Sequence, residues 1–415
     1  MPHDVITQVR ISGMRCLADV TLDLRGLTVL IGDNGTGKST ILEALELLRQ
    51  AAKPVSFVNE IVQRKHGGLQ NLLRSNAPVL GLEVTVEGDG PKLVYGVSIA
   101  SSGNGARVAA ETLVTEVVAR SDRQNVIVRA AQKVTIWTDN QQKAQPVDQQ
   151  SAEFNTYDSD LALTHADVAG LIAVKRMIRA LDNIDLQVPF ETRPTWQQTE
   201  LSNRGNLRNA VLVENVQRLD RFGENLANCF YTLHNGAPAV WDRVLTRVRL
   251  GLGQDIVDVR FPASRRGAIE MVLVLGRLPD RPMALDVLSD GQIAYLCCVA
   301  AVEFGGLRSL LAFDEPEIHL HPALLARVML MLEEVAERTP VVLSTHSDRL
   351  LDMLADPAKS VVLCELDDQG ATRLRRPDAG SLADWLQDYE GLGEVRARGY
   401  QAHVFEPRIG TGDKP

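Results

Sequence analysis

The hydrophobic pattern at the start of the chain predicts three strands followed by a helix. Apolar and polar positions alternate through residues 4–11 and 20–24, and a third run, Leu27–Ile31, is mainly apolar. Runs of this length and pattern are typical of strands. After the polar, glycine-rich segment 32–40, apolar residues recur at helical spacing from Ile41 to Leu48. One face of this helix is therefore expected to pack against a core.

Several strand-like runs follow in the middle of the chain, separated by clusters of glycine, aspartate and serine. They span residues 79–86, 93–99, 106–118 and 125–138. This pattern predicts an antiparallel sheet beside the N-terminal strands. The polar, glutamine-rich stretch 138–160 is predicted to be a loop.

The second half of the chain changes from helical to alternating patterning. Helical periodicity covers residues 168–181 and 206–250 without a sustained heptad repeat, which predicts a compact helical insertion and not a coiled coil. Short apolar strands then alternate with helices, the pattern of a parallel α/β sheet. The expected strands are 256–261, 268–275, 283–287, 309–313 and 341–344, and the expected helices are 291–304 and 322–338. The tail after residue 388 is mixed, and residues 410–415 are expected to be disordered.

The segment between the third strand and the first helix has the spacing of a phosphate-binding loop, and we call residues 32–40 the phosphate loop. Its glycines let successive N–H groups turn toward an anion, and the helix start adds its positive dipole end. Lys38 is expected to reach the outer phosphates, and the Ser39 hydroxyl to bind Mg²⁺. The expected binding residues are Asn34, Gly35, Thr36, Gly37, Lys38, Ser39 and Thr40. A glycine-rich turn that binds nothing is the alternative.

Two later strands end in residues suited to phosphate chemistry. Asp314 and Glu315 close the apolar strand 309–313. A carboxylate there can hold Mg²⁺, as we expect of Asp314, while Glu315 polarises an attacking water. His346 follows the next parallel strand, so it is expected at the same edge of the sheet. Solvent-facing acids and a purely structural histidine are the alternatives.

Residues 288–292, Leu-Ser-Asp-Gly-Gln, precede a buried helix, and we call them the signature segment. Ser289 is a good N-cap residue, so helix capping alone is one explanation of its position.

Composition narrows the class of protein. The chain has 415 residues, 45% of them hydrophobic and 23% charged, as in soluble globular proteins. The net charge of −9 argues against a generally basic nucleic-acid binder. The five cysteines lack metal-site spacing and are read as reduced core residues. No leader or membrane-spanning pattern is visible, so a cytoplasmic location is expected.

Taken in order, the phosphate loop, the signature segment, Asp314-Glu315-Pro316 and His346 resemble the Walker A, signature, Walker B and switch-histidine motifs of ABC-type ATPases. One departure is Asp290, where the commonest signature has glycine. The long stretch between Lys38 and Ser289 looks like the RecF, SMC and OLD group, and the chain most resembles AAA_21-like bacterial ATPases. Many of these occur in DNA repair or phage-defence modules.

The resemblance implies an α/β ABC-type ATPase head with an antiparallel side sheet and a helical insertion. Residues 1–150 and 251–415 would form the head, and 151–250 the insertion. It implies ATP and Mg²⁺ as cofactors, and ATP-driven pairing of two heads. Ser289, Gly291 and Gln292 of one copy would then close over the nucleotide held by the other. Arg15 is also implied to lie near the nucleotide.

The sequence leaves several points open. The resemblance implies coupling to DNA or to a separate effector protein; a slow, ATP-gated scaffold that sequesters a toxin or nuclease is the main alternative, and a transporter subunit the third. The chain after Asp368 is too short for the Toprim nuclease domain of OLD proteins, so the acids at 365–368 are predicted to be a hairpin turn. His319 and His321 are predicted to be structural.

The basic residues Arg243, Arg247, Arg249, Arg265 and Arg266 form either a solvated face or a DNA contact. The nucleotide-sensing glutamine is left open among Gln63, Gln70, Gln149 and Gln150.

Overall fold

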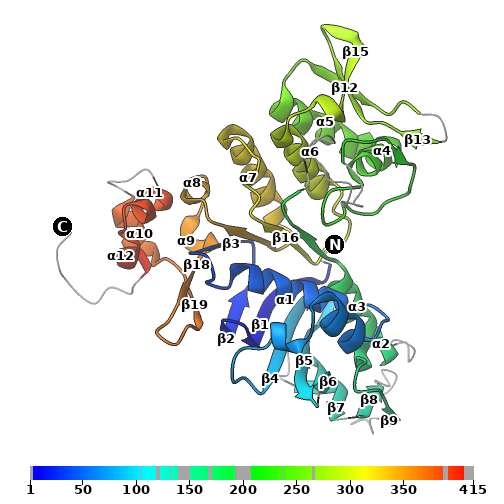
Figure 1. Cartoon of the computed structure of the whole chain (residues 1–415), viewed down its shortest axis with the longest axis vertical. Helices are drawn as coiled ribbons and strands as arrows, with labels where there is room; N and C mark the ends of the chain where they lie inside the picture. The colour runs from blue at the N-terminus through cyan, green and yellow to red at the C-terminus, as the bar shows by residue number, and fades with distance from the viewer. Residues whose placement is uncertain are drawn as a thin grey trace.

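A mainly parallel six-stranded sheet runs through the middle of the molecule (Figure 1). Its strand order is β10-β16-β17-β3-β18-β19, and only β19 is antiparallel to its neighbour. The strands are β3 (Leu27–Ile31), β10 (Ile184–Gln187), β16 (Leu310–Asp314), β17 (Val341–Thr345), β18 (Val361–Leu366) and β19 (Thr372–Arg375). The computed structural model describes residues 3–103, 105–117, 122–130, 132–138, 150–166, 171–190, 192, 207–236, 238–263, 267–386 and 391–405. The predicted parallel sheet is confirmed.

An antiparallel eight-stranded sheet lies beside the first, in the order β2-β1-β4-β5-β6-β7-β8-β9. Its strands are β1 (Val5–Met14), β2 (Leu17–Asp23), β4 (Val79–Gly88), β5 (Gly90–Ser102), β6 (Gly105–Val117), β7 (Asp122–Ala130), β8 (Lys133–Thr138) and β9 (Gln150–Asn155). The run 125–138 is two strands rather than one. The loop predicted for 138–160 is wrong at its C-terminal end, because β9 pairs along the whole of β8. Residues 139–149 lie outside the described part.

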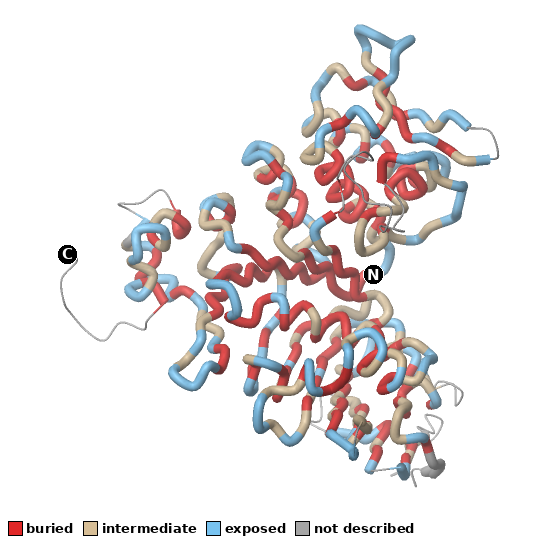
Figure 2. The backbone as a smooth tube through the Cα atoms, viewed as in Figure 1, coloured by how far each residue is buried: buried red, intermediate tan, exposed pale blue. Residues whose placement is uncertain are grey.

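The two sheets share a core with the first helices. These are α1 (Lys38–Gln50), α2 (Ala162–Ala166), α3 (Ile172–Asp182), the π-helix η1 (Phe57–Lys65) and the 3₁₀ turn η2 (Leu69–Asn71). Alternate residues of the central strands, such as Leu310 and Ala312, face this core, together with Ile41 and Leu45 of α1. Buried residues run continuously through this region (Figure 2). The phosphate-loop helix is thereby fixed against the sheet that carries its preceding strand.

A helical lobe packs against the opposite face of the central sheet. It contains α4 (Leu226–Gly236), α5 (Pro238–Leu252), α6 (Asp290–Glu303), α7 (Pro322–Ala336) and the 3₁₀ turn η5 (Leu285–Val287). Short strands extend it: β11 (Val211–Leu212), β13 (Ala268–Ile269), β12 (Ile256–Arg260), β14 (Val272–Leu275) and β15 (Leu278–Ala284). The residues Leu311 and Phe313 of β16 face this second core.

The helix predicted for residues 206–250 is wrong in its first part, because the helix begins only at Leu226 and residues 207–225 are not helical. Side chains here bond to nearby backbone and so compete with helix formation. The Asp220 carboxylate accepts hydrogen bonds from the N–H groups of Phe222, Glu224 and Asn225. The segment 151–250 contains β10, a strand of the central sheet, as well as helices. The division into head and insertion stays a prediction.

The C-terminal residues form small helices at the far end of the central sheet (Figure 1). They are α8 (Asp348–Leu351), α9 (Pro357–Ser360), α10 (Ala379–Trp385), α11 (Leu392–Ala397) and α12 (Gln401–Phe405). The chain of α11 packs closely on α8: the Gly393 N–H donates to Oδ1 of Asp352 at 2.7 Å, and a methyl group on Gly393 would overlap the carbonyl of Asp348. Residues 406–415 lie outside the described part.

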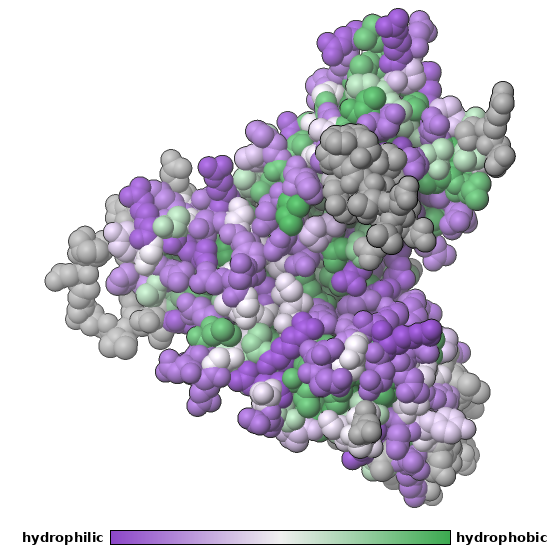
Figure 3. Space-filling model, in the orientation of Figure 1, coloured by the Kyte–Doolittle hydropathy of each residue, from purple (hydrophilic) through white to green (hydrophobic). Residues whose placement is uncertain are grey.

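The surface and the cysteines agree with the expected class of protein. All five cysteines are free, and four of them are buried. The face in Figure 3 is mostly hydrophilic, with hydrophobic residues in small separate groups. In the described ranges, no helix has both the length and the apolar character that a membrane span needs.

Candidate functional site

The phosphate loop has a backbone that favours glycine at Gly32, Gly35 and Gly37, and at two of these positions a Cβ would also meet a neighbour. Gly32 has φ 159°, and a Cβ there would lie 2.1 Å from the carbonyl oxygen of Cys364. Gly37 has φ 103°, and a Cβ there would lie 2.7 Å from Oγ1 of Thr372. Both glycines therefore let the loop curl against β18 and β19. Thr372 holds it there, because its hydroxyl donates to the Thr36 carbonyl at 2.9 Å.

The side chain of Lys38, the first residue of α1, points back across the phosphate loop. Its ammonium donates to the carbonyls of Gly32 and Asp33 at 2.7 and 2.8 Å, and the residue is only 4% exposed. Burial lowers the pKa of Lys38, and the nearby acids Glu315 and Asp33 oppose that shift. Asn34, Gly35 and Ser39 are exposed, whereas Thr36 and Thr40 are buried. A cation held at the base of an open, glycine-rich loop is suited to bind a phosphate.

Asp314 and Glu315 end β16 two strands away from the phosphate loop. The hydroxyl of Ser344, in β17, donates to Oδ1 of Asp314 and so fixes that carboxylate. Glu315 has φ 48°, an uncommon value for a residue other than glycine. Its N–H donates to the Ser344 carbonyl at 3.0 Å. Strained backbone of this kind is concentrated at functional sites.

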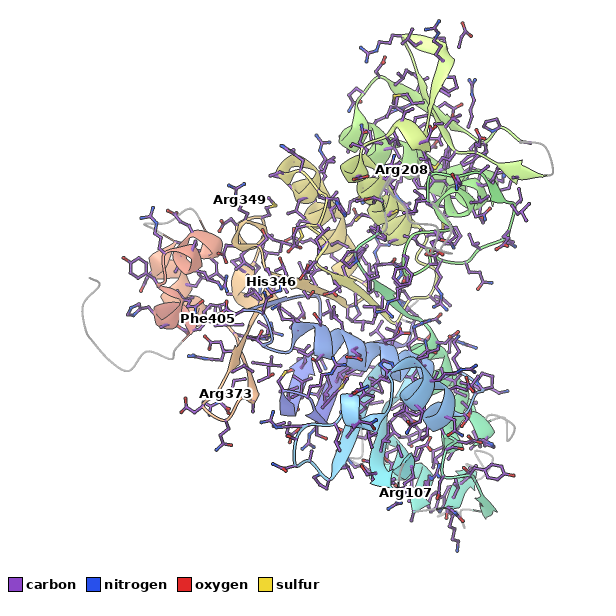
Figure 4. The ribbon with its side chains drawn as sticks, viewed as in Figure 1. Arg107, Arg208, His346, Arg349, Arg373 and Phe405 are labelled. Carbon is purple, nitrogen blue, oxygen red and sulfur yellow. The ribbon has the colours of Figure 1, made fainter. Side chains whose placement is uncertain are left out.

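His346 meets Glu315 at the end of β17. Its Nε2 lies 3.3 Å from Oε1 of Glu315, and both side chains are about one-third exposed. Glu317 positions the histidine from behind, because its Oε1 accepts hydrogen bonds from the Thr345 hydroxyl and the His346 N–H. Burial raises the pKa of Glu317. Figure 4 places His346 between the central sheet and the C-terminal helices.

These groups share one edge because β16, β17 and β3 are parallel neighbours. Thr345 is in register with Ile31, so His346 and Gly32 leave the sheet side by side. The exposed Ser39 hydroxyl and the Asp314 carboxylate are oxygen donors, the type that Mg²⁺ prefers. A phosphate cradle, a candidate metal carboxylate and an acid–histidine pair can together support phosphoryl transfer to water.

The signature segment is held by the helix cap that the sequence suggested and by contacts of Arg208 that the sequence did not reveal. Ser289 forms a capping box with Gln292 at the start of α6. The side chain of Arg208 donates to the carbonyls of Leu285, Asp286 and Leu288, and pairs with Oδ1 of Asp290 at 2.6 Å.

The neighbour of the signature segment is the turn that follows Glu315. A methyl group on Gly291 would lie 2.6 Å from the carbonyl oxygen of His319, so this helix start is packed directly on that turn. Within the described ranges, no hydrogen bond or ion pair joins the signature segment to the phosphate loop. Arg208 lies in the helical lobe, away from His346 (Figure 4).

Two protein-family models match the two parts of the chain that contain the motif residues. The family model AAA_15, described as "AAA ATPase domain", matches residues 5–164, and AAA_21, described as "AAA domain, putative AbiEii toxin, Type IV TA system", matches residues 274–352. An OLD nuclease of Thermus scotoductus is 36% identical over 63 residues, which are 13% of this chain and 12% of that relative.

Solved structures match nearly the whole chain. An SMC head bound to the C-terminal winged-helix domain of ScpA is 12% identical with a TM-score of 0.53, over 89% of this chain and 96% of that one. A Pyrococcus furiosus Smc head with an extended coiled coil, bound to the C-terminal domain of ScpA, is 11% identical with the same TM-score, over 93% and 99%. These similarities confirm the predicted fold. Together, the two family models and the SMC-head fold support an ABC-, SMC- and OLD-like ATPase family for this chain.

In this head, the side chain of Arg15 contacts α1, the helix that follows the phosphate loop. Its guanidinium pairs with Glu43 of α1 at 2.6 Å and donates to the Asn71 carbonyl at 3.1 Å. His66 contacts the same carboxylate. The prediction that Arg15 lies near the nucleotide has no support from these contacts and stays a prediction.

The glutamine that senses nucleotide in ABC proteins has a better candidate than the four considered from sequence. Gln187 ends β10, beside the strand that carries Asp314 and Glu315. It is fully buried, its amide donates to Asp185 at 2.7 Å, and its Oε1 has no hydrogen-bond partner among the residues that the structure describes. Gln150, in contrast, begins the outermost strand of the side sheet, and Gln149 lies outside the described part. Gln187 has no distinctive neighbours in the sequence, so only the strand order identifies it.

The remaining candidates have structural explanations. His321 caps α7 by accepting from the Ala323 N–H, and His319 occupies the turn before it with φ 69°. Residues 367–371 form the predicted hairpin turn between β18 and β19. Groups of acids, histidines or cysteines able to hold a metal ion are absent from the part of the chain that is described.

The basic concentration on α5 is occupied by contacts inside the protein. Arg243 and Arg247 pair with Glu303, Arg247 also pairs with Glu334, and Arg249 donates to backbone carbonyls of β12. Arg265 and Arg266 lie outside the described residues. Two of the three α5 arginines are thus paired with acids of the same chain, and the third is hydrogen-bonded to backbone.

Proposed function

We propose that this protein binds ATP with Mg²⁺ at the phosphate loop and hydrolyses it. The observation that carries the proposal is the meeting of Lys38, the Asp314–Glu315 pair and His346 at the ends of three adjacent parallel strands. Lys38 would bind the outer phosphates, with Ser39 and Asp314 holding Mg²⁺. That ion would neutralise the phosphate charge. Glu315 would accept a proton from the attacking water while His346 orients the reacting groups.

His346→Ala tests the second half of this mechanism. We expect ATP turnover to fall about 100-fold, because a group poised at the developing charge acts mainly in the transition state. ATP affinity should change little, since the phosphate loop is left intact. Steady-state hydrolysis and equilibrium binding measure the two effects separately. Unchanged turnover would assign His346 a structural role.

We further propose that ATP joins two copies head to head. The signature segment makes no described contact with the phosphate loop of its own chain, so its Ser289 is free to act on the nucleotide of a second copy. The serine hydroxyl and the α6 N-terminus are suited to contact a phosphate. Each ATP would then lie between Lys38 of one copy and Ser289 of the other.

The test of pairing is the molar mass in solution with and without Mg-ATP, measured by light scattering under slow-turnover conditions. We expect the wild-type mass to double with ATP, and Ser289→Arg to remain at its nucleotide-free mass because a bulky cation occupies the interface. Ser102→Arg, at an exposed position of the side sheet, is the matched control and should behave as wild type. A mass that rises with ATP in Ser289→Arg would exclude this interface.

A separate effector protein is the partner that we favour, in a phage-defence or DNA-repair setting. The matched SMC heads carry a domain of ScpA, and the α5 arginines that would favour DNA are occupied. ATP turnover measured with duplex DNA over a range of salt concentrations distinguishes the two partners, because DNA contacts weaken steeply with salt. A slow scaffold would combine very low turnover with tight, ATP-dependent retention of a protein from the native host.

A further inference from the structure

Arg396, on helix α11, reaches the phosphate loop from outside the motif residues. Its guanidinium lies between two carboxylates: one terminal nitrogen is 3.6 Å from Oδ1 of Asp33, and the other pairs with Asp348. Asp348 is two residues after His346, and the Asp33 carbonyl already holds the Lys38 ammonium. Arg396 is therefore the second cation beside the loop. The expected arginine, Arg15, is engaged by Glu43 instead.

The side chain of Arg396 is mostly buried, whereas the loop carboxylate beside it is open to solvent. It is 14% accessible, and its Nε is buried without a hydrogen-bond partner in the part of the chain that the structure describes. Asp33, by contrast, is 93% accessible. An open carboxylate on a loop meant for a polyanion would repel that ligand unless a cation lay beside it. Arg396 supplies that cation, and its terminal nitrogen on the Asp33 side lies beyond hydrogen-bond distance of that carboxylate.

The docking of α11 has contacts besides the Arg396–Asp348 pair. The Gly393 N–H bonds to Asp352, the backbone of Gly393 packs on Asp348, and Leu392 and Val395 are fully buried. Helix attachment is thus shared among several contacts. The Asp348 pair holds one terminal nitrogen of Arg396, and the other terminal nitrogen, 3.6 Å from Asp33, faces the phosphate loop.

We infer that Arg396 binds the terminal phosphate of a nucleoside triphosphate held by the phosphate loop of the same chain. Guanidinium groups bind phosphate through paired N–H donors, and these are strong, charge-assisted hydrogen bonds. The inference rests on the proposed function, since it requires nucleotide at the loop. It adds that α11, together with the helix α8 on which it packs, responds to the presence of the third phosphate.

The test compares a slowly hydrolysed ATP analogue with ADP by isothermal titration calorimetry. Arg396→Gln should weaken the triphosphate about 10- to 100-fold and leave ADP within about 3-fold, as expected for one lost charge-assisted bond. Arg398→Gln, two residues further along and paired with Glu394, is the matched control and should bind both like wild type. Arg396→Lys should restore part of the discrimination. Equal weakening of both nucleotides would overturn the inference and assign Arg396 a structural role.

A second pair of variants separates direct contact from neutralisation of Asp33. Asp33→Asn combined with Arg396→Gln should still bind the triphosphate poorly if Arg396 donates to phosphate. Full recovery of affinity in the double variant would show that Arg396 acts only on Asp33, and the contact would be disproved. Wild-type protein that binds neither nucleotide would instead refute the proposed function, so the two failures are distinguishable.

Discussion

Glu315→Gln is expected to bind ATP as wild type does and to hydrolyse it about 10²–10⁴-fold more slowly. Glutamine keeps the size and hydrogen-bonding reach of glutamate, but it cannot accept the proton of the attacking water. Asp314 keeps its bond from Ser344 and can still hold Mg²⁺. The loss should therefore fall on the chemical step alone.

The same variant should accumulate as an ATP-bound pair of heads, visible as a doubled mass in light scattering with Mg-ATP. Adding Ser289→Arg should return it to the nucleotide-free mass. Glu60→Gln, an exposed acid paired with Arg64 on η1, is the control and should hydrolyse ATP normally. Wild-type turnover in Glu315→Gln would remove Glu315 as the base. An inactive variant whose mass never changes with ATP would reject head-to-head pairing while leaving the active site assignment intact.

Lys38→Ala should lose tight binding of ATP and ADP alike, by about 100-fold or more. The side chain crosses the loop to the carbonyls of Gly32 and Asp33, and the same ammonium can turn to bound phosphate. Removing one partner of a buried charge pair costs about 2–5 kcal/mol, which corresponds to losses of this size. Backbone amides would remain but could not offset the phosphate charge.

Calorimetric titration with each nucleotide measures the effect, and a thermal melt shows whether the fold persists. Lys359→Ala, a highly exposed lysine paired with Asp356, should bind both nucleotides unchanged. Affinity at the wild-type level in Lys38→Ala would contradict the phosphate-loop assignment. Lys38→Ala should weaken both ATP and ADP, whereas Arg396→Gln should weaken only the triphosphate. This difference distinguishes the roles of the two cations.

Local sequence was sufficient for the elements that carry the motif residues. The apolar run before Gly32, the helical spacing after Lys38 and the strand ending at Asp314 all appear as predicted. Each of these signals lies within one strand–turn–helix unit, where spacing along the chain and position in space are directly related. The strand β9 was missed because its polar composition resembles a loop, and only pairing with β8 makes it a strand.

The contacts around the motifs could not be read in this way. Arg208 supports the signature segment from far away in the sequence, and its own surroundings contain no motif. Arg396 reaches the phosphate loop from a tail whose pattern indicated only mixed structure. Gln187 is distinguished only by lying beside β16. Such residues depend on the order of strands and on helix docking, which hydrophobic periodicity does not encode.

The packing of Gly291 on His319 bears on how two sites in a paired molecule communicate. The turn after Glu315 and the helix start that offers Ser289 are in backbone contact, with no room for even a methyl group between them. In a pair of heads, that rigid unit would carry the base for one ATP and the closing hydroxyl for the other. Occupation of one site would then prepare the second, so ATP hydrolysis is expected to rise sigmoidally with ATP concentration, with a Hill coefficient above one. Replacing Gly291 by alanine should force this unit apart and make the dependence hyperbolic.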